Sequence, residues 1–266
     1  MLHVQVGPSP LALGLIVPAT LMAGFDVCIV GRPGDSSPRE YGHAGSGPTG
    51  RLRYPEVTWF IGPATSSDLP DDLSERIQSD EPLLITCTLR GAISKRRPLI
   101  EEVLQVRPEG SETILLACEN APAPPYSEIA TSCPGVDVRR TVVNRMCVGL
   151  KPDRDGRRMV SAHPLGEWLI ERKGQGSTLL DALEAVDEVE GVDDIEARHD
   201  RKLWMVNGAH QALALMAQAA NTDELQRVAQ NPRITARLHH LHAAMDAALH
   251  HSHPGRATCP TCPGLF

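Results

Sequence analysis

The sequence is poor in aromatic residues and lacks clustered basic segments, long apolar runs and an even number of cysteines. Aromatic residues make up 3% of the 266 residues, so the core must be built from Leu, Val, Ile, Ala and Met. A formal net charge of -7 argues against a broad nucleic-acid-binding surface, which needs clustered Lys and Arg. No uncharged apolar run reaches about 18 residues, so no membrane-spanning helix is expected. Seven scattered cysteines indicate reduced thiols and a cytoplasmic location.

Short apolar runs separated by turn residues predict an α/β fold. Residues 2–7 and 25–30 predict buried strands and residues 11–24 the helix between them, which makes a βαβ unit of a parallel sheet. Further strands are expected at 56–61, 83–88 and 113–118, with a helix at 92–105; helical patterns follow at 178–189, 199–219, 222–230 and 233–251. We therefore predict a Rossmann-like dinucleotide-binding domain at 1–150 and a smaller, mostly α-helical substrate and catalytic domain at 151–266.

The residues after the first predicted strand resemble a dinucleotide-binding turn. Such a turn needs small residues because its backbone approaches a pyrophosphate held at a helix N-terminus. Gly7 stands at the first glycine position, Ser9 and Ala12 stand at the second and third, and Gly14 follows. Ser at the second position departs from the pattern, and Pro10 is unusual beside it. A plain βαβ turn without a ligand is the alternative interpretation.

An arginine follows the second predicted strand, where an acidic residue would bind the ribose hydroxyls of NAD. The chain reads Val30-Gly31-Arg32-Pro33 at this point. Because a guanidinium pairs with a phosphate through two hydrogen bonds, Arg32 predicts NADP(H) in preference to NAD(H). The alternative is that Arg32 is a solvated loop residue.

The second half of the chain places Lys202, Asn207 and His210 within an arc of ~140° on one helix. Oxidation of an alcohol needs a base for the hydroxyl proton and donors that hold the alkoxide. A buried Lys with a lowered pKa serves as such a base, and Asn serves as such a donor. The alternative is an amphipathic helix whose polar face meets solvent.

The spacing Lys202-x4-Asn207-x2-His210 resembles the signature of the polyol-specific long-chain dehydrogenases, a family that includes mannitol 2-dehydrogenases and mannitol-1-phosphate 5-dehydrogenases. Other segments resemble the same family in order and spacing: Leu84 to Thr88, Leu116 to Asn120, Val142 to Arg145, and the pair Glu167-Trp168. Asn144 departs from the family pattern, which has Asp before the arginine.

The resemblance implies an NAD(P)-dependent oxidoreductase that interconverts a hydroxyl and a carbonyl on a polyol, sugar or sugar phosphate without a metal. It makes Lys202 the general acid/base, Asn120 and Asn207 the donors to the alkoxide oxygen, and His210 the residue that orients a substrate hydroxyl. It also places Thr88 beside the nicotinamide, and Asn144 and Arg145 at the substrate.

Two other functions remain open. The first is a catalytically inactive relative that binds a nucleotide or a sugar phosphate, which Ser9 and Pro10 favour. The second is a different reaction on the same scaffold, such as an isomerase that keeps its cofactor bound. In every case the expected partner is a small molecule and not a nucleic acid or a membrane, and a homodimer is a further expectation because small two-domain enzymes often dimerise.

The sequence ends in a segment rich in His and Cys. Cys259 and Cys262 form a Cys-x2-Cys pair, and His250 and His253 have a spacing suited to the two remaining ligands of a tetrahedral zinc. One such pair is half of a zinc site. The alternative is a chance cluster that binds no metal.

Overall fold

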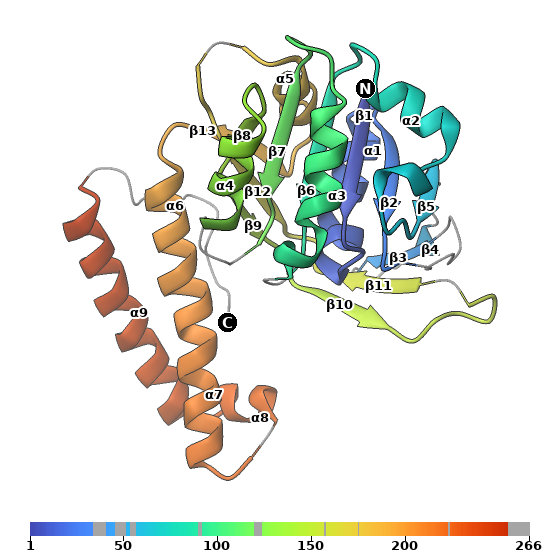
Figure 1. The fold of residues 1–266 in the computed structure, drawn as a ribbon. Helices are drawn as coiled ribbons and strands as arrows, with labels where there is room; N and C mark the ends of the chain where they lie inside the picture. Colours follow the sequence, from blue (N-terminus) through green and yellow to red (C-terminus); the bar gives the residue numbers. More distant parts are fainter. Residues whose placement is uncertain are drawn as a thin grey trace. The chain divides into compact units, whose positions relative to one another are not determined.

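The chain forms two compact units, Met1–Asp193 and Asp194–Phe266. The structure, a computed structural model, describes residues 1–33, 41–45, 52–53, 57–89, 92–119, 124–156, 158–174, 176–222 and 224–254. Figure 1 follows the chain from the strands and helices of the first unit to the helices of the second.

A six-stranded parallel sheet forms the centre of the first unit. Its order is β5-β2-β1-β6-β7-β8, and each neighbouring pair runs parallel. The strands are β1 (Leu2–Val6), β2 (Asp26–Val30), β5 (Trp59–Ile61), β6 (Leu83–Cys87), β7 (Thr113–Ala117) and β8 (Asp137–Arg139). This is the strand order of a Rossmann fold. All strands run parallel, and the sequence in which successive strands are added to the sheet changes direction between β1 and β6. The predicted α/β fold class is confirmed.

Helices cover both faces of this sheet. The π-helix η1 (Ala12–Ile16) and α1 (Val17–Met22) pack on one face, and α2 (Asp71–Ile77), α3 (Ile93–Gln105) and α4 (Pro124–Ser132) pack on the other. A 3₁₀ turn, η2 (Ser66–Asp68), precedes α2. Strand residues alternate between the two faces: Val27 and Ile29 of β2 lie in one apolar cluster, and Cys28 and Val30 lie in the other.

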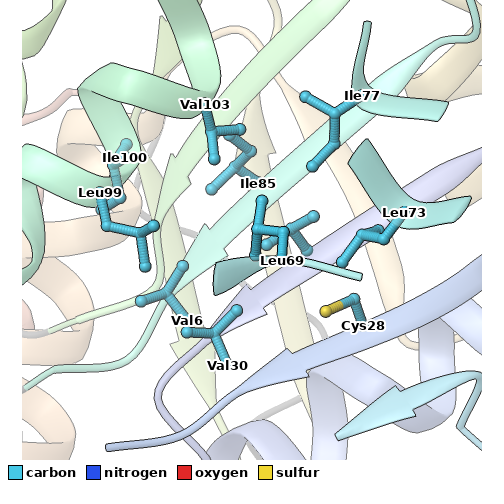
Figure 2. A pocket seen from close by; sticks show the side chains of 11 residues that line it. Val6, Cys28, Val30, Leu69, Leu73, Ile77, Ile85, Leu99, Ile100 and Val103 are labelled. Carbon is cyan, nitrogen blue, oxygen red and sulfur yellow. The ribbon is translucent and has the colours of Figure 1, made fainter. Parts of the chain in front are cut away.

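A small apolar pocket lies between the sheet and the helices α2 and α3 (Figure 2). Its volume is about 340 Å³, including the space open to solvent at its mouth. Eleven apolar side chains line it, among them Val30 and Ile85 from the sheet and Leu99 from α3. No polar side chain lines this pocket, so it is a gap in the packing and not a site for a polar ligand.

The first helix begins with a π turn because of a proline. Val17 N–H bonds to the carbonyl of Ala12, five residues earlier, and Pro18 follows at the start of α1. Pro18 has no N–H, so the carbonyl of Gly14, four residues earlier, loses its usual helical donor. Arg145 fills that place: its Nη1 donates to the Gly14 carbonyl at 3.2 Å.

Two smaller sheets complete the first unit. One has the order β10-β11-β3-β4, with β3 (Tyr41–Gly45), β4 (Leu52–Arg53), β10 (Cys147–Leu150) and β11 (Arg158–Ala162). The other has the order β13-β12-β9, with β9 (Thr141–Asn144), β12 (Glu167–Glu171) and β13 (Val189–Val192), and α5 (Thr178–Glu184) precedes β13. Trp168 of β12 is 0% exposed, and its Nε1 donates to the Thr141 hydroxyl at 2.9 Å.

The second unit is helical. It contains α6 (Ile195–Arg201), the π-helix η3 (Lys202–Gly208), α7 (Ala209–Ala219), α8 (Leu225–Ala229) and α9 (Pro232–Ser252). Asp194 caps α6 through the Ala197 N–H, and Asn231 caps α9 through the Arg233 N–H. No helix within the described ranges is both long enough and apolar enough to cross a bilayer.

The boundary between the units lies further along the chain than the sequence predicted. We expected domains at 1–150 and 151–266, but β11, β12, α5 and β13 belong to the compact unit Met1–Asp193. The reason is long-range pairing, since β11 pairs with β10 and β3, and β12 pairs with β9. The range 178–189, expected as one helix, is α5 followed by the start of β13.

Candidate functional site

Gly7 begins the turn after β1, at the point where the strand order reverses. Ligands of open α/β sheets bind beside the carboxyl ends of the strands at this point. Gly7 has φ +93°, and a Cβ on it would lie 3.0 Å from the Thr88 carbonyl oxygen. A side chain at this position would therefore be strained and would also collide with the end of β6. The turn thus requires glycine for local reasons alone.

The prediction for Ser9 is a cofactor contact, and in the structure this residue caps the first helix. Its hydroxyl accepts from the Ala12 N–H at 3.1 Å, and its carbonyl accepts from the Leu13 N–H at 3.0 Å. Pro10 follows at the first helical position, which proline favours. A side-chain cap explains why Ser stands where the pattern has glycine.

Few backbone N–H groups of this turn remain for an anion. Pro8 and Pro10 have none, and the Gly7 and Ser9 N–H groups bond to the carbonyls of Val30 and Gly7. The Ala12 and Leu13 N–H groups bond to Ser9. The Leu11 N–H is the amide of this stretch that remains for a ligand. The turn therefore offers a pyrophosphate fewer donors than a helix N-terminus usually does.

Ala12 and Gly14 lie inside the protein. Both are buried on η1, and a Cβ on Gly14 would lie 2.6 Å from the Sγ of Cys147 and 3.2 Å from the Cβ of Ala162. Gly14 therefore permits the close contact between the first helix and the sheet that contains β10 and β11. Its part is packing, which is the role expected of the last small residue in such turns.

Arg32 lies exposed after β2, and a second arginine supports the segment before it. Arg96 of α3 donates to the carbonyls of Gly31 and Pro63, the latter at 2.9 Å. Arg96 is 9% exposed, and burial lowers the pKa of its guanidinium. Two cationic side chains thus lie at or next to the end of β2.

Thr88 at the end of β6 is nearly buried, and its hydroxyl bonds inside the protein. The hydroxyl donates to the Gly7 carbonyl at 2.7 Å and accepts from Gln5 Nε2 at 3.2 Å. Thr88 therefore links β6 to the turn after β1. Sequence reasoning missed Gln5, whose polar side chain in the middle of an apolar strand was the available signal.

Glu119 connects three elements at the ends of β6 and β7. Its Oε1 accepts from the Leu89 N–H at 2.9 Å and from the Tyr126 hydroxyl at 2.7 Å. Burial, Cys87 and Glu119 together raise the pKa of Tyr126, so this phenol stays a donor. Asn120, the predicted oxyanion donor, follows Glu119 directly and lies outside the described residues. Glu119 is a residue that the motif contained and that sequence reasoning left without a role.

Lys202, Asn207 and His210 all lie on the continuous helix formed by α6, η3 and α7. Lys202 and Asn207 are the first and sixth residues of the π segment and are half-buried. Five residues is the hydrogen-bonding period of a π-helix, so the two lie one turn apart on the same side. His210 is exposed in the first turn of α7. The π winding brings the lysine and the amide closer in angle than a regular α-helix would.

Helix α9 packs against this segment. A Cβ on Gly208 would lie 3.0 Å from the Cε of Met245, so the missing side chain allows a close approach. Burial lowers the pKa of His242, while a hydrogen bond with the Met205 backbone opposes that shift. Arg201 and Asp246 form an ion pair at 3.6 Å. These contacts fix the π segment within the second unit.

Arg145 and Asn144, expected at the substrate, lie at the end of β9. The Arg145 guanidinium donates to three backbone carbonyls: those of His163 at 2.7 Å, Pro164 at 3.1 Å and Gly14 at 3.2 Å. Asn144 is half-buried and pairs with Glu167 of β12. Three of the five N–H groups of Arg145 thus hold the backbone.

The two histidines considered for zinc lie near the end of α9, where each forms an ion pair. His250 lies 3.6 Å from Asp246, and His253 lies 3.0 Å from Asp200. Cys259 and Cys262 lie outside the described residues. Within the described part of the chain, no group of three His, Cys, Asp or Glu residues is arranged to hold a metal ion.

Solved structures share this fold. The structure is similar to Pseudomonas fluorescens mannitol 2-dehydrogenase in a ternary complex with NAD and D-mannitol, with a TM-score of 0.68 and 14% identity over 98% of this chain and 65% of that chain. D-sorbitol dehydrogenase gives a TM-score of 0.64 and 11% identity over 93% of this chain and 68% of that one. Dimeric ketopantoate reductase from Staphylococcus aureus gives a TM-score of 0.55 and 13% identity over 96% of this chain and 81% of that chain.

These comparisons concern the fold. No family model matches the sequence, and no curated protein is similar to it in sequence. The chain spans 65% of the length of the mannitol 2-dehydrogenase. Across this span the chain has the fold of the polyol dehydrogenases.

Proposed function

We propose that this protein is a nicotinamide-dependent oxidoreductase that interconverts a hydroxyl and a carbonyl on a polyol, sugar or sugar phosphate. The observation that carries the proposal is the π segment, which brings Lys202 and Asn207 to one side of a helix, one turn apart. A π turn gives up regular α-helical hydrogen bonds and is frequently found at functional sites. The similarity of the fold to mannitol and sorbitol dehydrogenases supports the same class of reaction.

The residues of the first unit fit a dinucleotide in part. The glycine turn lies at the reversal of the strand order, and Arg32 lies exposed at the end of β2, which suits the 2′-phosphate of NADP(H) better than NAD(H). Gly7, Ser9 and Thr88 shape the turn, the Leu11 N–H would be a donor to the ligand, and Ala12 and Gly14 allow the helix to approach. The bound nicotinamide would supply or accept the hydride.

The chain's own residues handle the proton and the oxygen. In the reducing direction Lys202 donates its proton to the carbonyl oxygen of the substrate, and in the oxidising direction it accepts the hydroxyl proton. Asn207 and Asn120 donate hydrogen bonds to that oxygen as negative charge develops. His210 orients a neighbouring hydroxyl. Arg145 and Asn144 contribute by fixing the backbone beside the substrate.

Titration with NADPH and with NADH tests the cofactor site. We expect micromolar binding of NADPH, weakened at least tenfold by Arg32→Asp, because the variant removes a phosphate partner and adds a repelling charge. Arg154→Asp, the same charge change at an exposed position between β10 and β11, is the matched control and should bind normally. An equal loss of NADPH affinity in both variants would mean that the net charge of the protein, and not a contact of Arg32 with the phosphate, determines the affinity.

A screen of polyols and sugar phosphates tests the chemistry. Lys202→Ala should lower kcat by about 10²–10⁴-fold without changing the dissociation constant of the dinucleotide, because it removes an acid/base group only. Unchanged turnover in this variant would contradict the assigned role.

A catalytically inactive relative that binds a nucleotide or sugar phosphate is the second candidate. The observation that favours it is the shortage of N–H donors in the turn from Gly7 to Leu13. Binding of NADPH without turnover on any polyol, sugar or sugar phosphate would favour this candidate. A homodimer is a further proposal, and sedimentation that shows only monomer at micromolar concentration would contradict it.

A further inference from the structure

The carbonyl oxygen of Gly7 accepts three hydrogen bonds. They come from the Ser9 N–H at 3.0 Å, from Gln5 Nε2 at 3.1 Å and from the Thr88 hydroxyl at 2.7 Å. A carbonyl oxygen has two lone pairs, so the three donors share its acceptor capacity. Gln5 Nε2 in turn shares its two hydrogens among the Gly7 carbonyl, the Val6 carbonyl and the Thr88 hydroxyl. The peptide plane between Gly7 and Pro8 cannot rotate without breaking all three bonds.

The donor side chains belong to a buried row of polar residues in the centre of the sheet. The Thr86 hydroxyl donates to Gln5 Oε1 at 2.7 Å, and His3 Nε2 lies 2.7 Å from the same hydroxyl. Gln5 pairs with Thr86 across β1 and β6. His3, Gln5 and Thr86 are each 0% exposed. We call His3, Gln5, Thr86 and Thr88 the polar row.

The hydrogen bonds of the polar row run in one direction. Because the single hydrogen of Thr86 goes to Gln5, His3 Nε2 must be the donor to Thr86. His3 Nδ1 then lies as an acceptor 2.9 Å from the Thr20 hydroxyl, whose one hydrogen is shared with a second acceptor, the Val17 carbonyl at 3.0 Å. Burial lowers the pKa of His3 to about 3, so the ring remains neutral and this arrangement persists at neutral pH. The orientation of the Gln5 amide, and hence its bond to Gly7, follows from the row.

A row of this kind is costly at this place. Central strands of a parallel sheet are normally apolar on both faces, and each buried polar group is tolerated only when hydrogen-bonded. Apolar residues would fill the same space at lower cost. The row ends at the turn whose N–H donors are nearly all used, so the shape of that turn decides what it can bind.

We propose that the polar row is a positioning device for the dinucleotide, in which Thr86 and His3, remote from the ligand, hold the Gln5 amide and so fix the Gly7–Pro8 peptide against which the dinucleotide binds. The inference rests on the proposed function, because it concerns the same turn. It adds positioning residues inside the sheet that the dinucleotide does not touch.

The test compares two buried threonines. Thr86→Val removes the hydroxyl between His3 and Gln5 while keeping the shape of the side chain. Thr141→Val is the matched control, since its hydroxyl also joins two buried partners, the Trp168 Nε1 and the Leu169 carbonyl. Both variants should lower Tm by similar amounts. Thr86→Val should raise the NADPH dissociation constant about tenfold or more, Thr141→Val less than twofold, and Thr86→Ser should restore binding.

Hydrogen exchange gives a readout that does not depend on the ligand. Exchange of the Ser9 amide should accelerate severalfold in Thr86→Val and remain unchanged in Thr141→Val, because the Ser9 N–H donates to the carbonyl that the row fixes.

The outcomes separate the two proposals. Suppose that wild-type protein binds NADPH and that either Thr86→Val binds it as tightly as wild type or Thr141→Val binds it as weakly as Thr86→Val. Either result would contradict the positioning role of the polar row without contradicting the proposed cofactor site. Wild-type protein that binds neither NADPH nor NADH would overturn the proposed function and, with it, a row that positions a dinucleotide. Weakened binding in Thr86→Val with recovery in Thr86→Ser supports both.

Discussion

Arg145 shows how one side chain can meet two local needs of the backbone. Its side chain is 9% exposed, and its three donor groups reach the carbonyls of His163, Pro164 and Gly14. The Gly14 carbonyl lacks a helical donor because Pro18 has no N–H. An arginine is suited to this place because its five N–H groups are fixed in a planar fork. The resemblance predicted a residue at the substrate, and the hydrogen bonds describe a residue that ties β9 to the first helix.

Replacing Arg145 therefore has a consequence for stability that depends on Pro18. Arg145→Met should lower the free energy of unfolding by about 3 kcal/mol, roughly 1 kcal/mol for each carbonyl left without its donor. Pro18→Ala restores an N–H for the Gly14 carbonyl, so adding it to Arg145→Met should recover roughly 1 kcal/mol. Urea denaturation of the two single variants and the double variant measures this coupling. Purely additive effects would contradict the link between the two residues.

At the scale of elements, the sequence predicted the parallel strands well because each is an apolar run that is buried on both faces. The runs at β1, β2, β6 and β7 lie within one or two residues of their expected bounds. The strands β3 and β4 were missed, since the segment GHAGSGPTGRLR has the composition of a loop. Pairing with β11, more than 100 residues away, makes β3 a strand. A local pattern cannot contain that information.

The candidate site was predictable to the same degree. The spacing of Lys202, Asn207 and His210 predicted one helix, and the structure places all three on the continuous helix of η3 and α7. The π winding of that helix could not be predicted from the sequence, because the spacing of polar and apolar residues was interpreted with the period of a regular α-helix. The cap formed by Ser9 was also missed, since the same serine fits both a weakened glycine pattern and a helix cap.

The apolar pocket beneath α2 and α3 makes the two faces of β2 respond differently to the same substitution. Val30 lines the pocket, and Val27 lies fully buried on the other face. Val30→Ile adds a methylene to empty space and should raise the free energy of unfolding by about 0.8 kcal/mol. Val27→Ile adds a methylene to a filled core and should lower the free energy of unfolding by about 1–3 kcal/mol. Thermal unfolding of both variants checks this; equal losses would mean that the pocket cannot accept the added group.

At the scale of the whole molecule, the boundary near residue 193 follows from where the core residues lie in the chain. The apolar cluster around the first helix draws on residues from both sides of position 150. Those beyond it are Val160, Trp168, Ile170, Leu179, Leu180, Leu183, Val186 and Val189. A chain that ends at residue 150 would lose all of these, together with the strands that pair with β9, β10 and β3.

The size of that loss makes a fragment experiment decisive. Loss of a buried Trp costs about 3–5 kcal/mol, and each further buried aliphatic side chain costs roughly 1.5–3 kcal/mol. A domain is stable by only about 5–15 kcal/mol, so a fragment of residues 1–150 should not fold. A fragment of residues 1–193 keeps the complete cluster and should unfold cooperatively on heating, as followed by circular dichroism. Cooperative unfolding of the shorter fragment would instead place the boundary where the sequence predicted it, and the strands after β10 would then be an addition to a core that is complete without them.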